Sequence, residues 1–136
     1  MPFRTFSTVR FGDVDNAGIV FYPHFFIYFH EAFEQFFDDA GIAYHQLINA
    51  RRVAFPTVHI ESDFKAPLQY GDRLEIEITV PKIGTKSAVF RYRGYRHGDG
   101  MHAVTAEITT VCVDMTGFSS IDIPPDIRAL FERFSA

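Results

Sequence analysis

Residues 11–41 carry the strongest structural signal in this chain, and they read F-G-D-V-D-N-A-G-I-V-F-Y-P-H-F-F-I-Y-F-H-E-A-F-E-Q-F-F-D-D-A-G. A short acidic loop with two glycines runs into Pro23, and an aromatic-rich segment then continues without another proline or glycine until Gly41. Proline is favoured at the first helical position because its missing N–H would be unpaired there, and glycine is favoured just past a helix end. The stretch therefore predicts a helix over residues 23–40.

This helix is apolar on nearly every face. One stripe recurs at spacings of three and four and consists of Phe26, Phe29, Phe33, Phe36, Phe37 and Ala40. Other faces carry Phe25, Ile27 and Tyr28, while a polar strip includes His30 and Glu34. Such a helix is expected to be buried nearly all round.

The rest of the chain predicts strands joined by turns. Strands are expected at 3–11, 53–66 (interrupted or entered at Pro56), 73–80, 86–97 and 101–115, with a turn at 81–85, a hairpin at 98–100 and short helical segments at 42–52 and 124–134. Helix and strands are thus segregated along the chain, which favours an α+β fold with one antiparallel sheet. We expect a meander whose concave face covers the Phe-rich helix, in one domain over residues 1–136.

Composition excludes several classes of function. A net charge of −4 gives no electrostatic reason to bind nucleic acid or an anionic membrane. The only cysteine, Cys112, lies in an apolar run and is expected to be a core thiol. The N-terminus lacks the apolar segment of a signal peptide and no stretch has the length of a membrane span, so we expect a cytoplasmic protein.

The acidic loop offers the best candidate chemistry. The six histidines are scattered singly, which predicts no metal site, and there is no G-x-S-x-G motif. Asp15 precedes the helix start at Tyr22 and Pro23, where free N–H groups would stabilise an oxyanion beside a base or nucleophile. The alternative is that Asp13 and Asp15 only form the turn by capping local backbone groups. Spacing alone leaves both interpretations open.

Residues 13–25, D-V-D-N-A-G-I-V-F-Y-P-H-F, resemble the opening of the 4-hydroxybenzoyl-CoA thioesterase family of the hot-dog fold. That family's signature is D-x-D-x-x-G followed by an aromatic pair and a long central helix. Further similarities are Y-G-D-x-L at 70–74, K-S at 86–87 and I-x-I-P at 121–124. The resemblance implies an antiparallel sheet wrapped around one helix, edge-to-edge dimers that often form a homotetramer, and active sites between chains.

The resemblance also implies roles for individual residues. Asp15 would be the catalytic base or nucleophile, the Tyr22 backbone N–H would polarise the thioester carbonyl, and Asp13 would order the loop. His30 stands where relatives often carry an acidic residue, and it is a candidate for the acyl pocket. Lys86 is the first candidate to bind the phosphates of coenzyme A. The reserve candidates for phosphate binding are Arg51, Arg52, Lys82, Arg91 and Arg96.

The predicted function is therefore an acyl-CoA thioesterase that needs no metal or organic cofactor and acts on an aromatic or otherwise bulky acyl group. One alternative is a non-catalytic acyl-CoA-binding module, against which Asp15 argues. Another is an acyl-carrier-protein thioesterase or a hot-dog dehydratase, although the dehydratase histidine motif is not found in this sequence.

Overall fold

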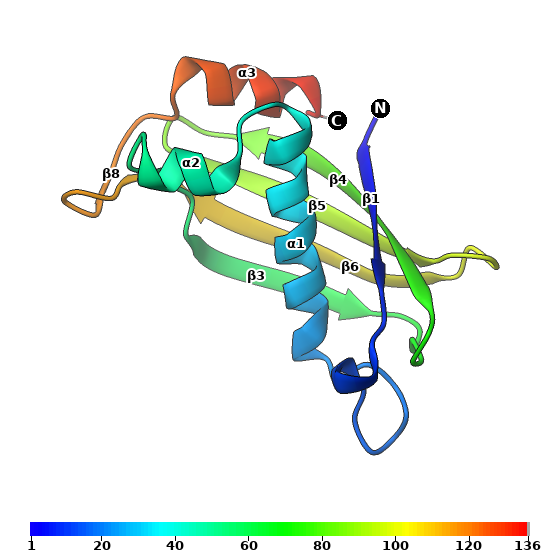
Figure 1. Cartoon of the computed structure of the whole chain (residues 1–136). Coiled ribbons are helices and arrows are strands. Elements are labelled where there is room, and N and C mark those ends of the chain that lie inside the picture. Colours follow the sequence, from blue (N-terminus) through cyan, green and yellow to red (C-terminus); the bar gives the residue numbers. More distant parts are fainter. Residues whose placement is uncertain (136) are drawn as a thin grey trace.

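The computed structural model describes residues 1–135, and Figure 1 shows a curved antiparallel sheet beside one long helix. The elements are β1 (Phe3–Thr8), the 3-10 turn η1 (Phe11–Asp13), α1 (Pro23–Asp39), α2 (Tyr44–Asn49), β2 (Val53–Ala54), β3 (Thr57–Phe64), β4 (Arg73–Ile83), β5 (Ser87–Arg96), β6 (His102–Val111), β7 (Val113–Asp114), β8 (Ser119–Ser120) and α3 (Pro125–Arg133). The predicted α+β class and hot-dog architecture are confirmed.

The main sheet has the strand order β1-β4-β5-β6-β3, and every pair in it is antiparallel. Strands β4, β5 and β6 form the predicted meander. The expectation fails for β3, which pairs with β6 rather than with its successor β4. The chain therefore places β1 at one edge, crosses the sheet with α1, and places β3 at the other edge.

Helix α1 begins at Pro23, as predicted, and ends at Asp39, with Ala40 as its C-cap. Gly41 has a φ of 79°, a conformation that disfavours side chains, and its N–H closes the last turn on the Asp38 carbonyl at 3.0 Å. Seven side chains of α1 are buried: Phe25, Tyr28, Phe29, Ala32, Phe33, Phe36 and Phe37. Two apolar residues differ from the expectation: Phe26 is half-buried, and Ile27 is exposed at 45%.

Two strand ends differ from the prediction because of local polar geometry. β1 stops at Thr8 rather than residue 11, since residues 11–13 form the turn η1, with Asp13 bonded back to Arg10. β4 continues through Pro81 to Ile83, where a turn was predicted. Proline lacks an N–H, but it lies in the register shift between Thr79 and Lys82, where no ladder hydrogen bond is lost.

The predicted strand 101–115 is in fact two strands. β6 ends at Val111, the Cys112 N–H donates to the Lys86 carbonyl at 2.7 Å, and β7 joins a second small sheet with β2 and β8. Cys112 is fully buried, as predicted for a core thiol, and burial raises its pKa to about 11. None of the helices in residues 1–135 combines the length and apolar character needed to cross a membrane.

Candidate active site

Residues 13–21 form a small two-stranded ribbon, here called the 13–21 ribbon. The Phe21 N–H donates to the Asp13 carbonyl at 2.9 Å, and the Asp15 N–H donates to the Ile19 carbonyl at 3.0 Å. Gly18, with a φ of 81°, lies in the turn between the two halves. Asp15 is therefore held opposite Ile19. Ile19 in turn lies three residues before Tyr22, next to the start of α1.

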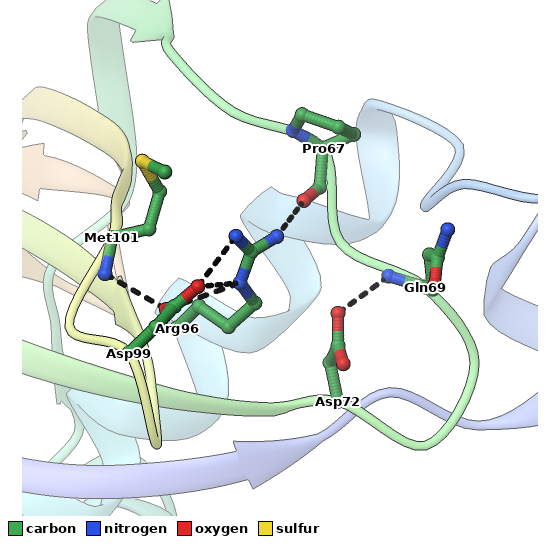
Figure 2. Close-up of polar contacts among 6 residues, drawn as sticks. All are labelled: Pro67, Gln69, Asp72, Arg96, Asp99 and Met101. Carbon is green, nitrogen blue, oxygen red and sulfur yellow. Dashed lines mark hydrogen bonds and ion pairs between the residues drawn. The ribbon is translucent and has the colours of Figure 1, made fainter.

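The ribbon is fixed to the sheet through the loop 65–72. The Val20 N–H donates to the Leu68 carbonyl at 2.9 Å. Figure 2 shows how the β5–β6 hairpin holds this loop: the Arg96 guanidinium donates to the Pro67 carbonyl at 3.2 Å and pairs with Asp99 at 2.7 Å. The position of Asp15 thus depends on contacts with two segments far away in the sequence.

Asp15 is exposed, and its Oδ1 accepts the Ala17 N–H at 2.8 Å. The turn-forming interpretation of this residue is therefore correct as far as Oδ1 is concerned. The second oxygen, Oδ2, accepts no hydrogen bond from any group in residues 1–135. One carboxylate oxygen orders the loop while the other is free to meet a ligand.

Tyr22 is the N-cap residue of α1 and is 60% exposed. The backbone N–H of Tyr22 makes no hydrogen bond within the described chain, whereas the next donors are used: His24 N–H bonds Phe21 O at 2.9 Å and Phe25 N–H bonds Tyr22 O at 3.2 Å. The positive end of the α1 dipole reinforces such a free donor. The site can thus stabilise negative charge on a substrate oxygen.

Asp13 is buried beneath the ribbon. Its Oδ2 accepts the Tyr28 hydroxyl at 2.7 Å and the Arg10 N–H at 3.0 Å, and its Oδ1 lies 3.5 Å from His24 Nδ1. Burial acts to raise the pKa of Asp13, but the hydrogen bonds and the Arg10 charge outweigh it and leave the pKa lowered. These contacts suit a residue that ties the ribbon to α1.

The groups that the site offers are a carboxylate, a backbone N–H and apolar walls. No cluster of three or more His, Cys, Asp or Glu side chains able to hold a metal ion occurs in residues 1–135. A cavity of about 370 Å³ adjoins Tyr22, and its walls include Phe25, Phe64 and Lys65. Sequence reasoning did not select Phe64 or Lys65, because their closeness to Tyr22 depends on β3 lying at the sheet edge.

His30 lies two turns further along α1, about 12 Å along the axis from Tyr22 at 1.5 Å per residue. Its side chain is 60% exposed, its Nε2 is 3.2 Å from Glu34 and its ring stacks on Phe33. It also lines a second cavity, between α1 and the sheet. His30 therefore lines an apolar cavity, and its role in acyl binding stays a prediction.

Lys86 is exposed and lies at the opposite end of the sheet from Asp15 and Tyr22. It precedes β5, whose ten residues span about 30 Å and whose start lies beneath α3 in Figure 1. Arg128 of α3 donates to the neighbouring Thr85 carbonyl at 3.2 Å. Within one protomer the structure does not bring Lys86 together with the other site residues. Three of the reserve candidates are engaged elsewhere: Arg51 with Asp126, Arg91 with Glu107 and Arg96 with Asp99.

Comparison with known proteins places this geometry in a family. Residues 9–131 match the Thioesterase-like superfamily. A 1,4-dihydroxy-2-naphthoyl-CoA hydrolase of Nostoc punctiforme is 33% identical over 129 residues, covering 93% of this chain and 84% of that protein.

Solved structures of thioesterases have a similar fold. A thioesterase-superfamily protein from Jannaschia sp. CCS1 has a TM-score of 0.92 at 28% identity, covering 99% of this chain and 94% of that one. A gentisyl-coenzyme A thioesterase has a TM-score of 0.84 at 28% identity, covering 92% and 98%. These matches do not single out the 4-hydroxybenzoyl-CoA branch that the sequence motif resembles. The chain belongs to the thioesterase-like superfamily and has its hot-dog fold.

Proposed function

We propose that this hydrolase of thioesters acts on 1,4-dihydroxy-2-naphthoyl-CoA or on the CoA ester of a similar hydroxylated aromatic acid. The observation that carries the proposal is the free Tyr22 N–H at the start of α1, beside the ribbon that presents Asp15. Two of the relatives described above act on hydroxylated aromatic acyl groups. The fold and the relatives therefore support the same aromatic substrate class.

The chemistry follows from these groups. The thioester carbonyl oxygen accepts the Tyr22 N–H, which stabilises the negative charge that forms as the carbonyl carbon is attacked. Asp15 either attacks that carbon itself, giving an anhydride that water then cleaves, or removes a proton from the attacking water. Both routes release coenzyme A as the thiol and the acyl group as the free acid.

A panel of substrates tests the proposal. We expect kcat/KM to be highest for 1,4-dihydroxy-2-naphthoyl-CoA, lower for 4-hydroxybenzoyl-CoA, and lowest for short-chain and long-chain aliphatic esters. Preference for an aliphatic ester would contradict the aromatic assignment. Tight binding of every ester without hydrolysis would favour the non-catalytic acyl-CoA-binding module. Faster hydrolysis of an acyl-carrier-protein ester than of the matching CoA ester would identify the acyl-carrier protein as the carrier of the substrate.

The protein is expected to be at least a dimer at working concentration. Within residues 1–135, strand β3 is an edge strand that pairs with β6 alone, and it exposes Val58 (59%), Ile60 (43%) and Phe64 (48%). Free edges with apolar side chains favour pairing with another chain. Light scattering should give a mass of at least two 15.6 kDa chains. An active species with the mass of a single chain would refute the expectation.

Lys86→Ala is expected to raise KM for a CoA ester several-fold with little change in kcat. A phosphate contact is equally strong in the ground and transition states, so its loss weakens binding alone. Since Asp15 and Lys86 lie at opposite ends of one protomer, we propose that Lys86 serves the site of a neighbouring chain. The KM difference should shrink at high salt, which screens exposed charges.

Arg133→Ala is the control variant, because Arg133 is an exposed basic residue of α3 that is not a candidate for the phosphates. A thioester truncated before the nucleotide provides a second control, and wild type and Lys86→Ala should have the same KM for it. An equal rise in KM for full-length and truncated substrates would show that Lys86 does not contact phosphate.

A further inference from the structure

A cavity of about 300 Å³ lies between α1 and the edge of the sheet formed by β3, β5 and β6. Helix α1 contributes Phe26, His30 and Phe33 to its walls, and Ile60 and Ile108 contribute from the strands. Its volume is at the lower end of the range of about 300–1,000 Å³ for small-molecule sites. Its walls are mainly aromatic and aliphatic, which suits a planar apolar group.

Tyr92 of β5 is the buried polar residue of this wall whose hydroxyl has no partner within residues 1–135. The residue is only 2% exposed and lines the cavity, yet its hydroxyl makes no hydrogen bond with any group in residues 1–135. Two other hydroxyls of the wall are already bonded: that of Tyr44 accepts the Phe55 N–H at 2.9 Å, and that of Thr110 donates to the Ala88 carbonyl at 3.3 Å. The fourth hydroxyl, that of Thr57, makes no hydrogen bond within residues 1–135 but belongs to an exposed residue at the start of β3. Because Tyr92 lines the cavity and its hydroxyl has no protein partner, that hydroxyl is available to a group that enters the cavity.

Burial, followed by the influence of Tyr44, raises the pKa of Tyr92, so its hydroxyl stays protonated at neutral pH. It can therefore both donate and accept a hydrogen bond. A ligand hydroxyl or carbonyl oxygen inside the cavity would provide the partner that the protein does not.

An aromatic wall leads from Tyr22 to this cavity. The Tyr22 ring lies 6.2 Å from that of Phe64, and the Phe64 ring lies 6.3 Å from that of Phe26, which lines the cavity. Phe26 is one helical turn beyond Tyr22, or about 6 Å along α1. An acyl group whose carbonyl is held at the Tyr22 N–H therefore has a continuous apolar surface along which its rings can extend.

We propose that the cavity between α1 and the sheet takes the ring system of the acyl group, and that Tyr92 is a specificity-determining residue that hydrogen-bonds a ring hydroxyl remote from the thioester. The inference rests on the proposed function and deepens it, since it names the ring hydroxyl as the feature of the substrate that the site recognises. A site built around a hydrogen bond discriminates against an analogue that lacks the bonding group, because its own polar group is then left unpaired.

Two CoA esters that differ in one hydroxyl test the proposal. 1,4-Dihydroxy-2-naphthoyl-CoA has a hydroxyl remote from the thioester, and 1-hydroxy-2-naphthoyl-CoA lacks it. Wild type should prefer the dihydroxy ester in kcat/KM by about tenfold. Tyr92→Phe should lose that preference through a lower value for the dihydroxy ester, with the monohydroxy ester little affected.

Tyr95→Phe is the matched control, because Tyr95 lies on the same strand three residues on and faces the other side of the sheet, where it stacks on His102. It should keep the wild-type preference. Equal rates for the two esters in wild type, or an unchanged preference in Tyr92→Phe, would overturn the proposal, and the first of these needs no variant at all.

A binding measurement separates this proposal from the proposed function. If wild type hydrolyses neither ester, the proposed substrate is wrong, and the cavity is then judged by calorimetry with the two free acids. Wild type should bind 1,4-dihydroxy-2-naphthoate about tenfold more tightly than 1-hydroxy-2-naphthoate, and Tyr92→Phe should bind them equally. Equal binding by wild type, or no binding of either acid, would overturn the role of Tyr92.

Discussion

Asp15→Asn is expected to lower kcat by about a hundredfold or more while the fold stays intact, because an amide is neither a base nor a nucleophile. The asparagine side-chain oxygen can still accept the Ala17 N–H that Asp15 accepts at 2.8 Å, so the turn should survive. Steady-state hydrolysis of 1,4-dihydroxy-2-naphthoyl-CoA measures the loss, and circular dichroism with thermal unfolding measures the fold.

Asp39→Asn is the control for this variant, since Asp39 is an exposed carboxylate in the last turn of α1. It should keep wild-type turnover. A folded Asp15→Asn enzyme with unchanged kcat would remove Asp15 from the mechanism. If Asp13→Asn abolished turnover and Asp15→Asn did not, the catalytic role would belong to the other aspartate of the motif.

Much of the fold could be predicted because its signals are local. Pro23 and Gly41 mark the ends of α1, and the alternation of residues 73–80 fixes which face of β4 is buried. The strand order could not be predicted in the same way. The pairing of β3 with β6 brings together residues 40 or more positions apart, and no local pattern encodes it.

The residues of the candidate site differ in the same way in how far the sequence predicts them. Asp15 and Tyr22 could be found from the sequence because they belong to one short motif next to a helix start. Tyr92 could not, because its unpaired hydroxyl is a property of the packing between β5 and α1. Lys86 shows a third case. Its place next to a turn, at the start of a strand, could be predicted to within one residue, but its distance from Asp15 is known only once the strands are placed.

Asp13→Asn is expected to destabilise the protein by about 2 kcal/mol at pH 7 and to affect activity mainly through loop order. The Asp13 carboxylate accepts bonds from Tyr28 and Arg10, and the amide that replaces it carries two donors and one acceptor. Denaturant unfolding followed by circular dichroism measures the loss. Asp39→Asn should leave the free energy of unfolding nearly unchanged.

The loss should depend on pH in a definite direction. The pKa of Asp13 is lower in the folded protein than its unfolded value of about 3.9, so its stabilising effect is present above about pH 4 and is lost as the pH falls through the folded value. The difference between wild type and Asp13→Asn should therefore be largest near neutrality and shrink at lower pH. A loss of equal size at pH 3 and pH 7 would show that the charge on Asp13 is not what stabilises the loop.

Tyr28→Phe separates the bond from the rest of the buried site, since it keeps the ring and removes only the hydroxyl that Asp13 accepts at 2.7 Å. If that bond carries the stabilisation, the losses of Asp13→Asn and Tyr28→Phe should not add in the double variant. Additive losses would instead assign the effect of Asp13 to Arg10 and the ribbon backbone. Because the hydroxyl belongs to α1 and the carboxylate to the ribbon, non-additivity would show directly that the helix positions the loop that presents Asp15.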